Sequence, residues 1–181
     1  MRAILLLLAV VPLALADKPI LECRFGKIPK SVIEIKTVKP DPTQEKCLAV
    51  TIYGEARGES DNGKIAVAWT AMNRATKKSI CKVVLAPKQF SIFNNNPALR
   101  MAAMSLNVEP RQKNVIDVAS WQRAVSIARA VYRKEISDPT LGATHYLAPV
   151  VMKAKGYIIP KWARKFIFKG KIDNQLFYKE I

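Results

Sequence analysis

Apolar residues recur at intervals of three or four positions in three stretches of the chain, and this period predicts three helices. The first is expected over residues 41–56, with Asp41 as its cap and Gln44 at the capping-box position. A second should begin near residues 61–62, where a high density of alanine would let another helix pack closely. The third shows the clearest pattern and is expected over residues 114–134.

In the C-terminal part of the chain the hydrophobic pattern becomes shorter and more typical of strands. A turn is expected at residues 138–142, followed by strands around residues 144–147, 166–168 and 176–178. Residues 173–174 would suit a hairpin between the last two strands. The chain is therefore expected to have an α+β fold, with a mainly helical core and a small β edge.

The N-terminus has the pattern of a secretory signal peptide. Arg2 is followed by an apolar run over residues 3–16, which ends in Ala14-Leu15-Ala16 before the chain turns polar. A helix over this run would cover about 21 Å, less than the ~30 Å hydrocarbon core, so a stable anchor is the weaker interpretation. A transient signal anchor that later releases remains an alternative. We expect export across the inner membrane to the periplasm or cell wall.

The remaining residues are expected to form an arm and one domain. Residues 17–40 contain several prolines and alternate in places, which suggests an extended N-terminal arm with one strand. Residues 41–181 would then be a single domain, because a chain of 181 residues fits one compact unit. The sequence contains no internal repeat, low-complexity tract or Gly/Ser linker.

The chain is strongly basic, and this restricts its partners. Thirty Lys and Arg against fourteen Asp and Glu give a net charge of +16, which favours nucleic acid, anionic lipid or an acidic wall polymer. Export argues against nucleic acid, and we expect a monomer. The segment from Lys153 to Lys171 has seven basic residues and no acid, and it is interleaved with aromatics. We expect its charge to guide the protein to anionic wall polymers or a membrane surface, with most of the aromatics buried as packing.

The cysteines and the single histidine limit the chemistry. In an oxidising compartment two of Cys23, Cys47 and Cys81 would pair, and composition does not decide which. The sequence has no C-x-x-C pair, and His145 is its only histidine, so a bound metal is not expected. A Gly-rich phosphate loop is also absent, and no other cofactor is expected. Most Ser-His-Asp and Cys-His arrangements are likewise disfavoured.

Carboxylate chemistry remains. Glu55 and Glu59 lie four positions apart at the end of an apolar helix, and they share a face if the helix persists. A carboxyl group beside Ile52 and Tyr53 would be partly desolvated, which favours the protonated form that a general acid for glycosidic cleavage needs. The alternative is an ordinary surface helix end with Glu–Arg pairs.

Several segments, in order and at compatible spacing, make the chain similar to the cell wall hydrolase family typified by spore-cortex-lytic enzymes. The resemblance covers roughly residues 45 to 178 and rests on Cys47–Glu59, which includes Glu-Ala-Arg-Gly-Glu, on Gly63–Ala68, Asn73-Arg74, Ile80–Val84, Gln89-Phe90-Ser91, Asp138–Thr140, Gly142-Ala143, His145-Tyr146, Pro160–Ala163 and Ile172–Tyr178. The chain departs from the family pattern at Ile92, where many relatives have Trp. It also departs at Asp173 and Gln175, where a glycine and a histidine would be expected, and this puts a role for the C-terminal turn in doubt.

The resemblance implies a lysozyme-like fold and cleavage of the β-1,4 bond between N-acetylmuramic acid and N-acetylglucosamine. It implies a lytic transglycosylase in which Glu55 acts alone, first as acid and then as base, with no cofactor. A hydrolase would need a partner carboxylate, for which Glu59 and Asp61 are the nearby candidates. Substrate-binding residues would be Gln89, Ser91, His145 and Tyr146. Both Cys47 and Cys81 lie inside the matched region, so the resemblance implies that they form the disulfide and leave Cys23 free.

The function expected from the sequence is therefore that of an exported, bacteriolytic enzyme that cleaves peptidoglycan, such as a phage endolysin or a small bacterial wall hydrolase. A hydrolytic muramidase and an amidase are the enzymatic alternatives. A non-catalytic cationic protein that binds wall or membrane is the alternative from a different class.

Overall fold

The computed structural model describes residues 38–181. The expected signal segment, nearly all of the expected arm and Cys23 lie outside the described residues. The helices are α1 (Pro42–Ala56), α2 (Asp61–Arg74), α3 (Ile80–Val84), α4 (Ser91–Asn95), α5 (Pro97–Met104), α6 (Val115–Tyr132) and α7 (Pro149–Ala154), with a 3-10 helix η1 (Lys161–Arg164). The strands are β1 (His145–Leu147), β2 (Ile167–Ile172) and β3 (Gln175–Lys179).

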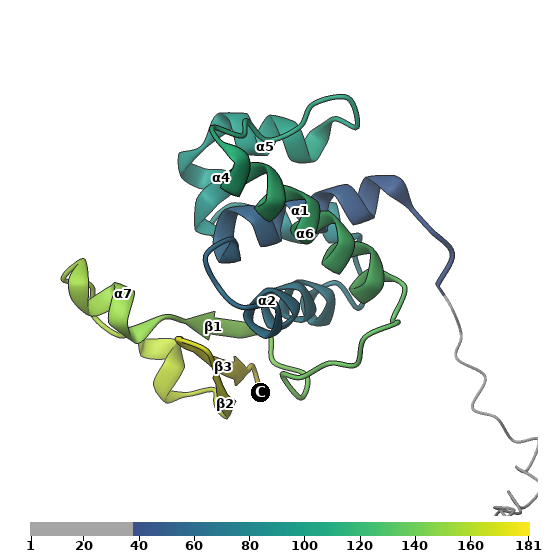
Figure 1. Ribbon diagram of the computed structural model, residues 1–181. Coiled ribbons are helices and arrows are strands. Elements are labelled where there is room, and N and C mark those ends of the chain that lie inside the picture. Colours follow the sequence, from purple (N-terminus) through teal and green to yellow (C-terminus); the bar gives the residue numbers. More distant parts are fainter. Residues whose placement is uncertain (1–37) are drawn as a thin grey trace, which may run out of the picture. The chain divides into compact units, whose positions relative to one another are not determined.

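The core is helical, as the sequence predicted. Helix α1 is buried along most of its length and contacts α6, α2, α3 and α5 (Figure 1). Because nearly every side of α1 is covered, apolar residues occur all round it rather than along one stripe. The core residues include Leu48, Ile52, Phe90, Phe93, Trp121, Ala124, Ile127 and Val131. The three helices expected from periodicity are confirmed.

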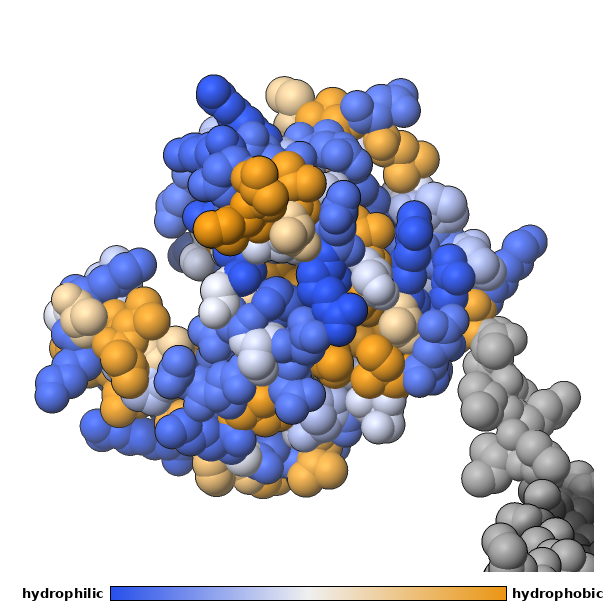
Figure 2. All heavy atoms as spheres, in the orientation of Figure 1, coloured by the Kyte–Doolittle hydropathy of each residue, from blue (hydrophilic) through white to orange (hydrophobic). Residues whose placement is uncertain are grey.

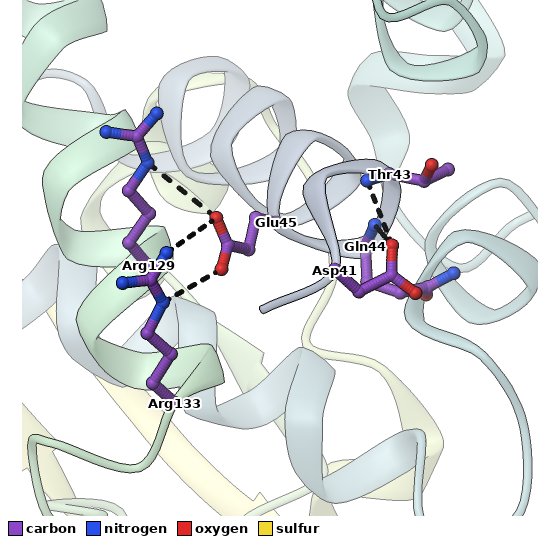
Figure 3. Close-up of polar contacts among 6 residues, drawn as sticks. All are labelled: Asp41, Thr43, Gln44, Glu45, Arg129 and Arg133. Carbon is purple, nitrogen blue, oxygen red and sulfur yellow. Dashed lines mark hydrogen bonds and ion pairs between the residues drawn. The ribbon is translucent and has the colours of Figure 1, made fainter. Parts of the chain in front are cut away.

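A buried carboxylate holds the start of α1 against α6. Glu45 is buried, and Nε of Arg133 donates to its Oε1 at 3.0 Å, while Nε of Arg129 lies 3.7 Å from its Oε2 (Figure 3). A buried charge is costly unless it is paired, so these contacts restrict how α6 can lie on α1.

The cap of α1 differs in part from the expectation. Oδ1 of Asp41 accepts hydrogen bonds from the amides of Thr43 at 3.0 Å and Gln44 at 3.1 Å, as a capping residue should (Figure 3). The prediction of a capping box is wrong, because Oε1 of Gln44 accepts a hydrogen bond from the backbone amide of Cys81 at 3.2 Å. That amide lies in the first turn of α3, where it has no partner within its own helix. Gln44 therefore links α1 to α3, beside the Cys47–Cys81 disulfide.

The β edge is a three-stranded antiparallel sheet in the order β1-β3-β2. The hairpin between β2 and β3 turns at residues 173–174, as predicted. Asp173 adopts a positive φ of 49°, a conformation that glycine adopts readily, and its Oδ2 accepts from the Ser60 hydroxyl at 2.6 Å. Asp173 thus ties the hairpin to the start of α2 through a side-chain contact that glycine, the residue expected here from the resemblance, could not make.

Two further features of the fold differ from what the sequence predicts. The short helices α3, α4, α5 and α7 were not predicted, because five to eight residues span too few turns to show a helical period.

The expected burial of the aromatics between residues 153 and 171 is also wrong. Tyr157 and Phe168 are exposed, while Trp162 and Phe166 are half-buried. The physical reason is that these residues lie at the edge of the fold. Strand β2 is an edge strand of the sheet, and no residue of α7 is buried.

Among the described residues, no helix combines the length and apolar character needed to cross a bilayer.

Candidate active site

Three elements converge on the carboxylate of Glu55, which projects from the last turn of α1. Its Oε1 accepts hydrogen bonds from the hydroxyl of Ser91 at 3.2 Å and from the amide of Ile92 at 3.3 Å. Its Oε2 accepts from the hydroxyl of Tyr146 on β1 at 2.9 Å. Three donors therefore fix the orientation of one half-buried carboxylate.

Glu55 lines an open cleft of about 580 Å³. The cleft lies between the helical core and the residues at the start of η1, where Figure 2 shows a hollow. The structure brings all four expected substrate-binding residues into this cleft. The lining consists of Glu55, Arg74, Lys88, Gln89, Phe90, Ser91, Asn94, His145, Tyr146, Pro160 and Trp162. Glu55 is the one carboxylate in that set, and cations and neutral hydrogen-bonding groups make up most of the rest.

The second candidate carboxylate does not reach the cleft. Helix α1 ends at Ala56, and the following turn is closed by the amide of Glu59, which donates to the carbonyl oxygen of Ala56 at 3.0 Å. The shared helix face expected for Glu55 and Glu59 is therefore absent, because the helix stops before Glu59. Asp61 is engaged elsewhere, since Nε of Arg123 donates to its Oδ1 at 2.9 Å. That hydrogen bond, from a cation, lowers the pKa of Asp61.

Tyr146 is a permanent donor to Glu55 near neutral pH. Burial, followed by the negative charge of Glu55, raises the pKa of the Tyr146 hydroxyl well above its ordinary range. The hydroxyl keeps its proton, so it contributes a hydrogen bond rather than a second negative charge.

Arg74 of α2 organises the opposite wall of the cleft. Its Nε donates to the carbonyl of Thr144, and its Nη1 donates to the carbonyl of Gln89 at 3.2 Å. Its guanidinium lies 5.0 Å from the ring centroid of Phe90. Burial lowers the pKa of Arg74, yet a guanidinium remains charged at neutral pH. Arg74 therefore joins β1 to the Gln89 turn and adds positive charge to the cleft.

His145 belongs to an aromatic cluster. Its ring centroid lies 5.1 Å from that of Trp162 and 4.7 Å from that of Phe166, and its Nδ1 is 3.0 Å from the hydroxyl oxygen of Thr144. Burial, and then the charge of Arg74, lower the pKa of His145, so the imidazole is neutral at neutral pH. The ring is positioned to pack and to support Trp162.

The sequence motifs do not by themselves single out Arg74 or Trp162 as site residues. Both fall in segments that carried the family resemblance, Asn73-Arg74 and Pro160–Ala163, so the signal was present without a residue-level assignment. Trp162 lines the cleft, and its ring also lies 5.6 Å from that of Tyr178 on β3. A rigid aromatic ring at the edge of a polar cleft can pack against the flat face of a sugar.

A close approach of backbone to side chain positions Ile92. A Cβ atom built on Gly54 would lie 2.1 Å from Cδ1 of Ile92, so the glycine leaves room for this side chain. The amide of Ile92 is one of the donors to Glu55, and Gly54 is the residue before Glu55. The side chain of Ile92, where the resemblance leads us to expect Trp, therefore packs against Gly54, the neighbour of Glu55 in the chain.

No group of three or more His, Cys, Asp or Glu side chains within residues 38–181 could hold a metal ion.

Comparisons with known proteins show the family and the fold of the chain. A family model described as Cell Wall Hydrolase matches residues 58–178. The catalytic domain of a germination-specific lytic transglycosylase, SleB from Bacillus anthracis, is 23% identical, with a TM-score of 0.55, and the alignment covers 78% of this chain and 98% of that one. The catalytic domain of the Bacillus cereus SleB protein is 21% identical, with a TM-score of 0.50, and the alignment covers 80% of this chain and 96% of that one. No curated protein matches the chain.

The solved structures share the α+β fold of this chain. The family match begins three residues after Glu55, so the case for Glu55 rests on the cleft itself.

Proposed function

The chain belongs to the cell wall hydrolase family, and from this we propose that it cleaves the β-1,4 bond between N-acetylmuramic acid and N-acetylglucosamine as a lytic transglycosylase. Membership makes the protein a peptidoglycan-cleaving enzyme. The bond cleaved, the single-acid mechanism and the residues that carry it are our proposal.

One observation carries the proposal: Glu55 is the one carboxylate that lines the cleft. Glycosidases that add water use two carboxyl groups, about 5–5.5 Å apart when the product retains its configuration and ~6.5–9.5 Å apart when it inverts. Glu59 lies outside the lining, and Asp61 is paired with Arg123. A reaction that needs one carboxyl group fits this set of residues better than one that needs two.

The proposed reaction uses Glu55 twice. The protonated carboxyl group gives its proton to the glycosidic oxygen, and the bond from that oxygen to C1 of the muramic acid breaks. The resulting carboxylate then accepts the proton of the C6 hydroxyl as the C6 oxygen bonds to C1. The products are a free 4-hydroxyl and a 1,6-anhydro end, no water is consumed, and Glu55 is again protonated.

The neighbours of Glu55 suit this double role. Ser91, the amide of Ile92 and Tyr146 donate three hydrogen bonds to the carboxylate, which stabilise it at the stage when it carries charge. These donors also hold the carboxylate still, so that the same group can face first the glycosidic oxygen and then the C6 hydroxyl. Both steps require one well-positioned group rather than two.

Two further features of the cleft are proposed to bind the glycan. The ring of Trp162 would pack against a sugar face, with His145 and Phe166 behind it. The side-chain amide of Gln89 would hydrogen-bond acetamido or hydroxyl groups of the glycan. Arg74 holds the backbone of Gln89 in place by donating to its carbonyl oxygen.

The reaction class is tested by mass spectrometry of peptidoglycan fragments digested with the purified protein. A lytic transglycosylase leaves 1,6-anhydro ends, which are lighter by one water than the reducing ends left by a muramidase. An amidase would instead release peptides from intact glycan. Reducing ends or released peptides as the main products would overturn the proposed mechanism while leaving the protein a wall-cleaving enzyme.

We also propose that residues 1–16 export the chain, as the sequence pattern predicts. The Cys47–Cys81 disulfide supports this, because stable disulfides are typical of oxidising compartments. Intact-mass analysis of the protein recovered from the periplasm or medium tests the proposal. A chain that begins at Asp17 shows cleavage, an intact chain found there shows release without cleavage, and a protein confined to the cytoplasm would contradict export.

A further inference from the structure

The end of the molecule that carries α7 exposes an unusual amount of aliphatic surface. We define the α7 tip as residues 149–159, that is, α7 and the turn that follows it. Within it Val150 is 67% exposed, Ile158 is 87% exposed and Ile159 is 52% exposed, and Val151 and Tyr157 are exposed as well. Figure 2 shows hydrophobic surface at this end of the molecule, bordered by hydrophilic residues, where Figure 1 places α7.

The backbone holds these side chains together as one surface. The amide of Tyr157 donates to the carbonyl of Met152 at 2.8 Å, and the amide of Gly156 donates to that of Lys153 at 3.1 Å. Gly156 has a positive φ of 67°, which lets the chain reverse at the end of α7. Residues 157–159 therefore leave the helix from a turn that these two hydrogen bonds close.

Positive charge borders this apolar surface. Lys153 and Lys155 lie within the α7 tip, and Lys161, Arg164 and Lys165 follow in and directly after η1. No acidic residue occurs between Pro139 and Ile172. The tip thus combines exposed aliphatic side chains with cations and lacks the anions that would neutralise them.

We propose that the α7 tip is a docking surface for an anionic lipid bilayer, with Ile158, Ile159 and Val150 inserted among the lipid headgroups and the lysines paired with lipid phosphates. The combination of exposed apolar side chains and flanking cations is what binds proteins to the interface of anionic membranes. An acidic wall polymer would satisfy the lysines, but it is hydrated throughout and offers no apolar phase to the isoleucines. Sugar faces pack on flat rings such as Trp162, which lies in the cleft.

This surface is separate from the catalytic proposal. None of residues 149–159 lines the cleft that contains Glu55, although Pro160 directly after the tip does. Docking would therefore hold the enzyme at a membrane beside its wall substrate without blocking the site, and it does not depend on which bond the enzyme cleaves.

Sedimentation with lipid vesicles of the protein that begins at Asp17, which lacks the apolar run of residues 3–16, tests the proposal. The probe is vesicles of phosphatidylcholine with and without phosphatidylglycerol, and the test variant is Ile158→Ser/Ile159→Ser. The matched control is Val115→Ser/Ile116→Ser, which removes two consecutive aliphatic side chains at the start of α6. These side chains are 83% and 77% exposed. We expect binding to the anionic vesicles, weakened at least about tenfold in the test variant and less than about twofold in the control.

A site-specific probe separates the tip from any other membrane contact of the chain. In a Cys23→Ser background, an environment-sensitive dye on Ile158→Cys should shift to the blue when anionic vesicles are added, whereas the same dye on Ile116→Cys should not. Equal binding of both serine variants, or no shift at position 158, would overturn the proposal. The proposal would also be overturned if the Ile158→Ser/Ile159→Ser variant lost binding to lipid-free wall but kept its binding to vesicles. That result would assign the tip to wall polymer.

Discussion

The hydroxyl of Tyr146 lies 2.9 Å from Oε2 of Glu55, although 91 positions separate the two residues in the chain. Glu55 comes from the end of a buried helix and Tyr146 from the first strand of a small sheet. The hydrogen bond therefore spans the junction between the helical core and the β edge. Because Tyr146 stays protonated, it can orient the carboxylate throughout the proposed reaction.

Replacement of Glu55 by Gln should abolish most wall lysis and leave the fold intact. The amide cannot donate and recover a proton, and loss of a general acid–base usually costs ~10²–10⁴-fold in rate. The measurement is the clearing rate of a purified wall suspension, with the melting temperature as the check on folding. Glu59→Gln is the matched control and should retain most of the activity. Equal losses in the two variants would instead support a hydrolase with two carboxylates.

Replacement of Tyr146 by Phe should reduce activity about ten- to a hundredfold, because one hydrogen bond to a charged carboxylate is lost. Tyr53→Phe makes the same chemical change in the core, where the buried hydroxyl has no hydrogen-bond partner among the described residues. That control should keep full activity. Digestion rates over a range of wall concentrations separate the effects, since a positioning role predicts a lower kcat rather than a higher KM. A Tyr146→Phe enzyme with unchanged kcat would remove Tyr146 from the mechanism.

Replacement of Gly54 by Ala should lower both stability and activity. The new methyl group would overlap Ile92, and such overpacking typically costs about 1–3 kcal/mol. Displacement of Ile92 would also move the amide that donates to Glu55. The double variant Gly54→Ala/Ile92→Ala opens space for the methyl group and should recover part of the lost activity. A double variant no more active than Gly54→Ala would show that the contact with Ile92 is not the cause.

Reduction of the Cys47–Cys81 disulfide should destabilise the domain by about 3–4 kcal/mol in the chain-entropy model, because the bond closes a separation of 34 residues. Denaturant unfolding with and without reductant gives the difference. Cys23→Ser should be unaffected in the oxidised form, because Cys23 is predicted to be free. Non-reducing peptide mapping provides the direct check, and a Cys23–Cys47 or Cys23–Cys81 peptide would contradict the pairing.

The stability of the protein should fall on the acid side of neutrality in part because of His145. Its pKa in the folded protein is below the ordinary 6.5, so the unfolded chain takes up the proton first as the pH falls. The contribution of the neutral ring is complete above pH 6.5 and is lost as the pH drops through the lower, folded value. The melting temperature of the wild type should therefore fall more than that of His145→Gln between pH 6.5 and about pH 5. Parallel curves for the two proteins would show that His145 titrates normally.

The sequence alone was sufficient for the parts of the fold that depend on neighbours along the chain. Helices α2 and α6 are long enough to show a helical period, while the start of α1 at the Asp41 cap and the turn at residues 173–174 rest on local chemistry. Resemblance to the family pointed to Glu55 and to four residues that line the same cleft, and their roles remain predictions. These features are encoded within short segments or ordered motifs.

Only the tertiary structure decided which groups meet. Periodicity allowed Glu55 and Glu59 to share a face, but α1 ends at Ala56, so one carboxylate lines the cleft and the other does not. The side chain of Gln44 does not form the expected capping box, because it accepts a hydrogen bond from a backbone amide in the first turn of α3. The apolar residues of the α7 tip remain exposed because none of its helix is buried against the core. Each outcome depends on contacts between distant segments, and the pattern of a single segment does not specify the segment against which it packs.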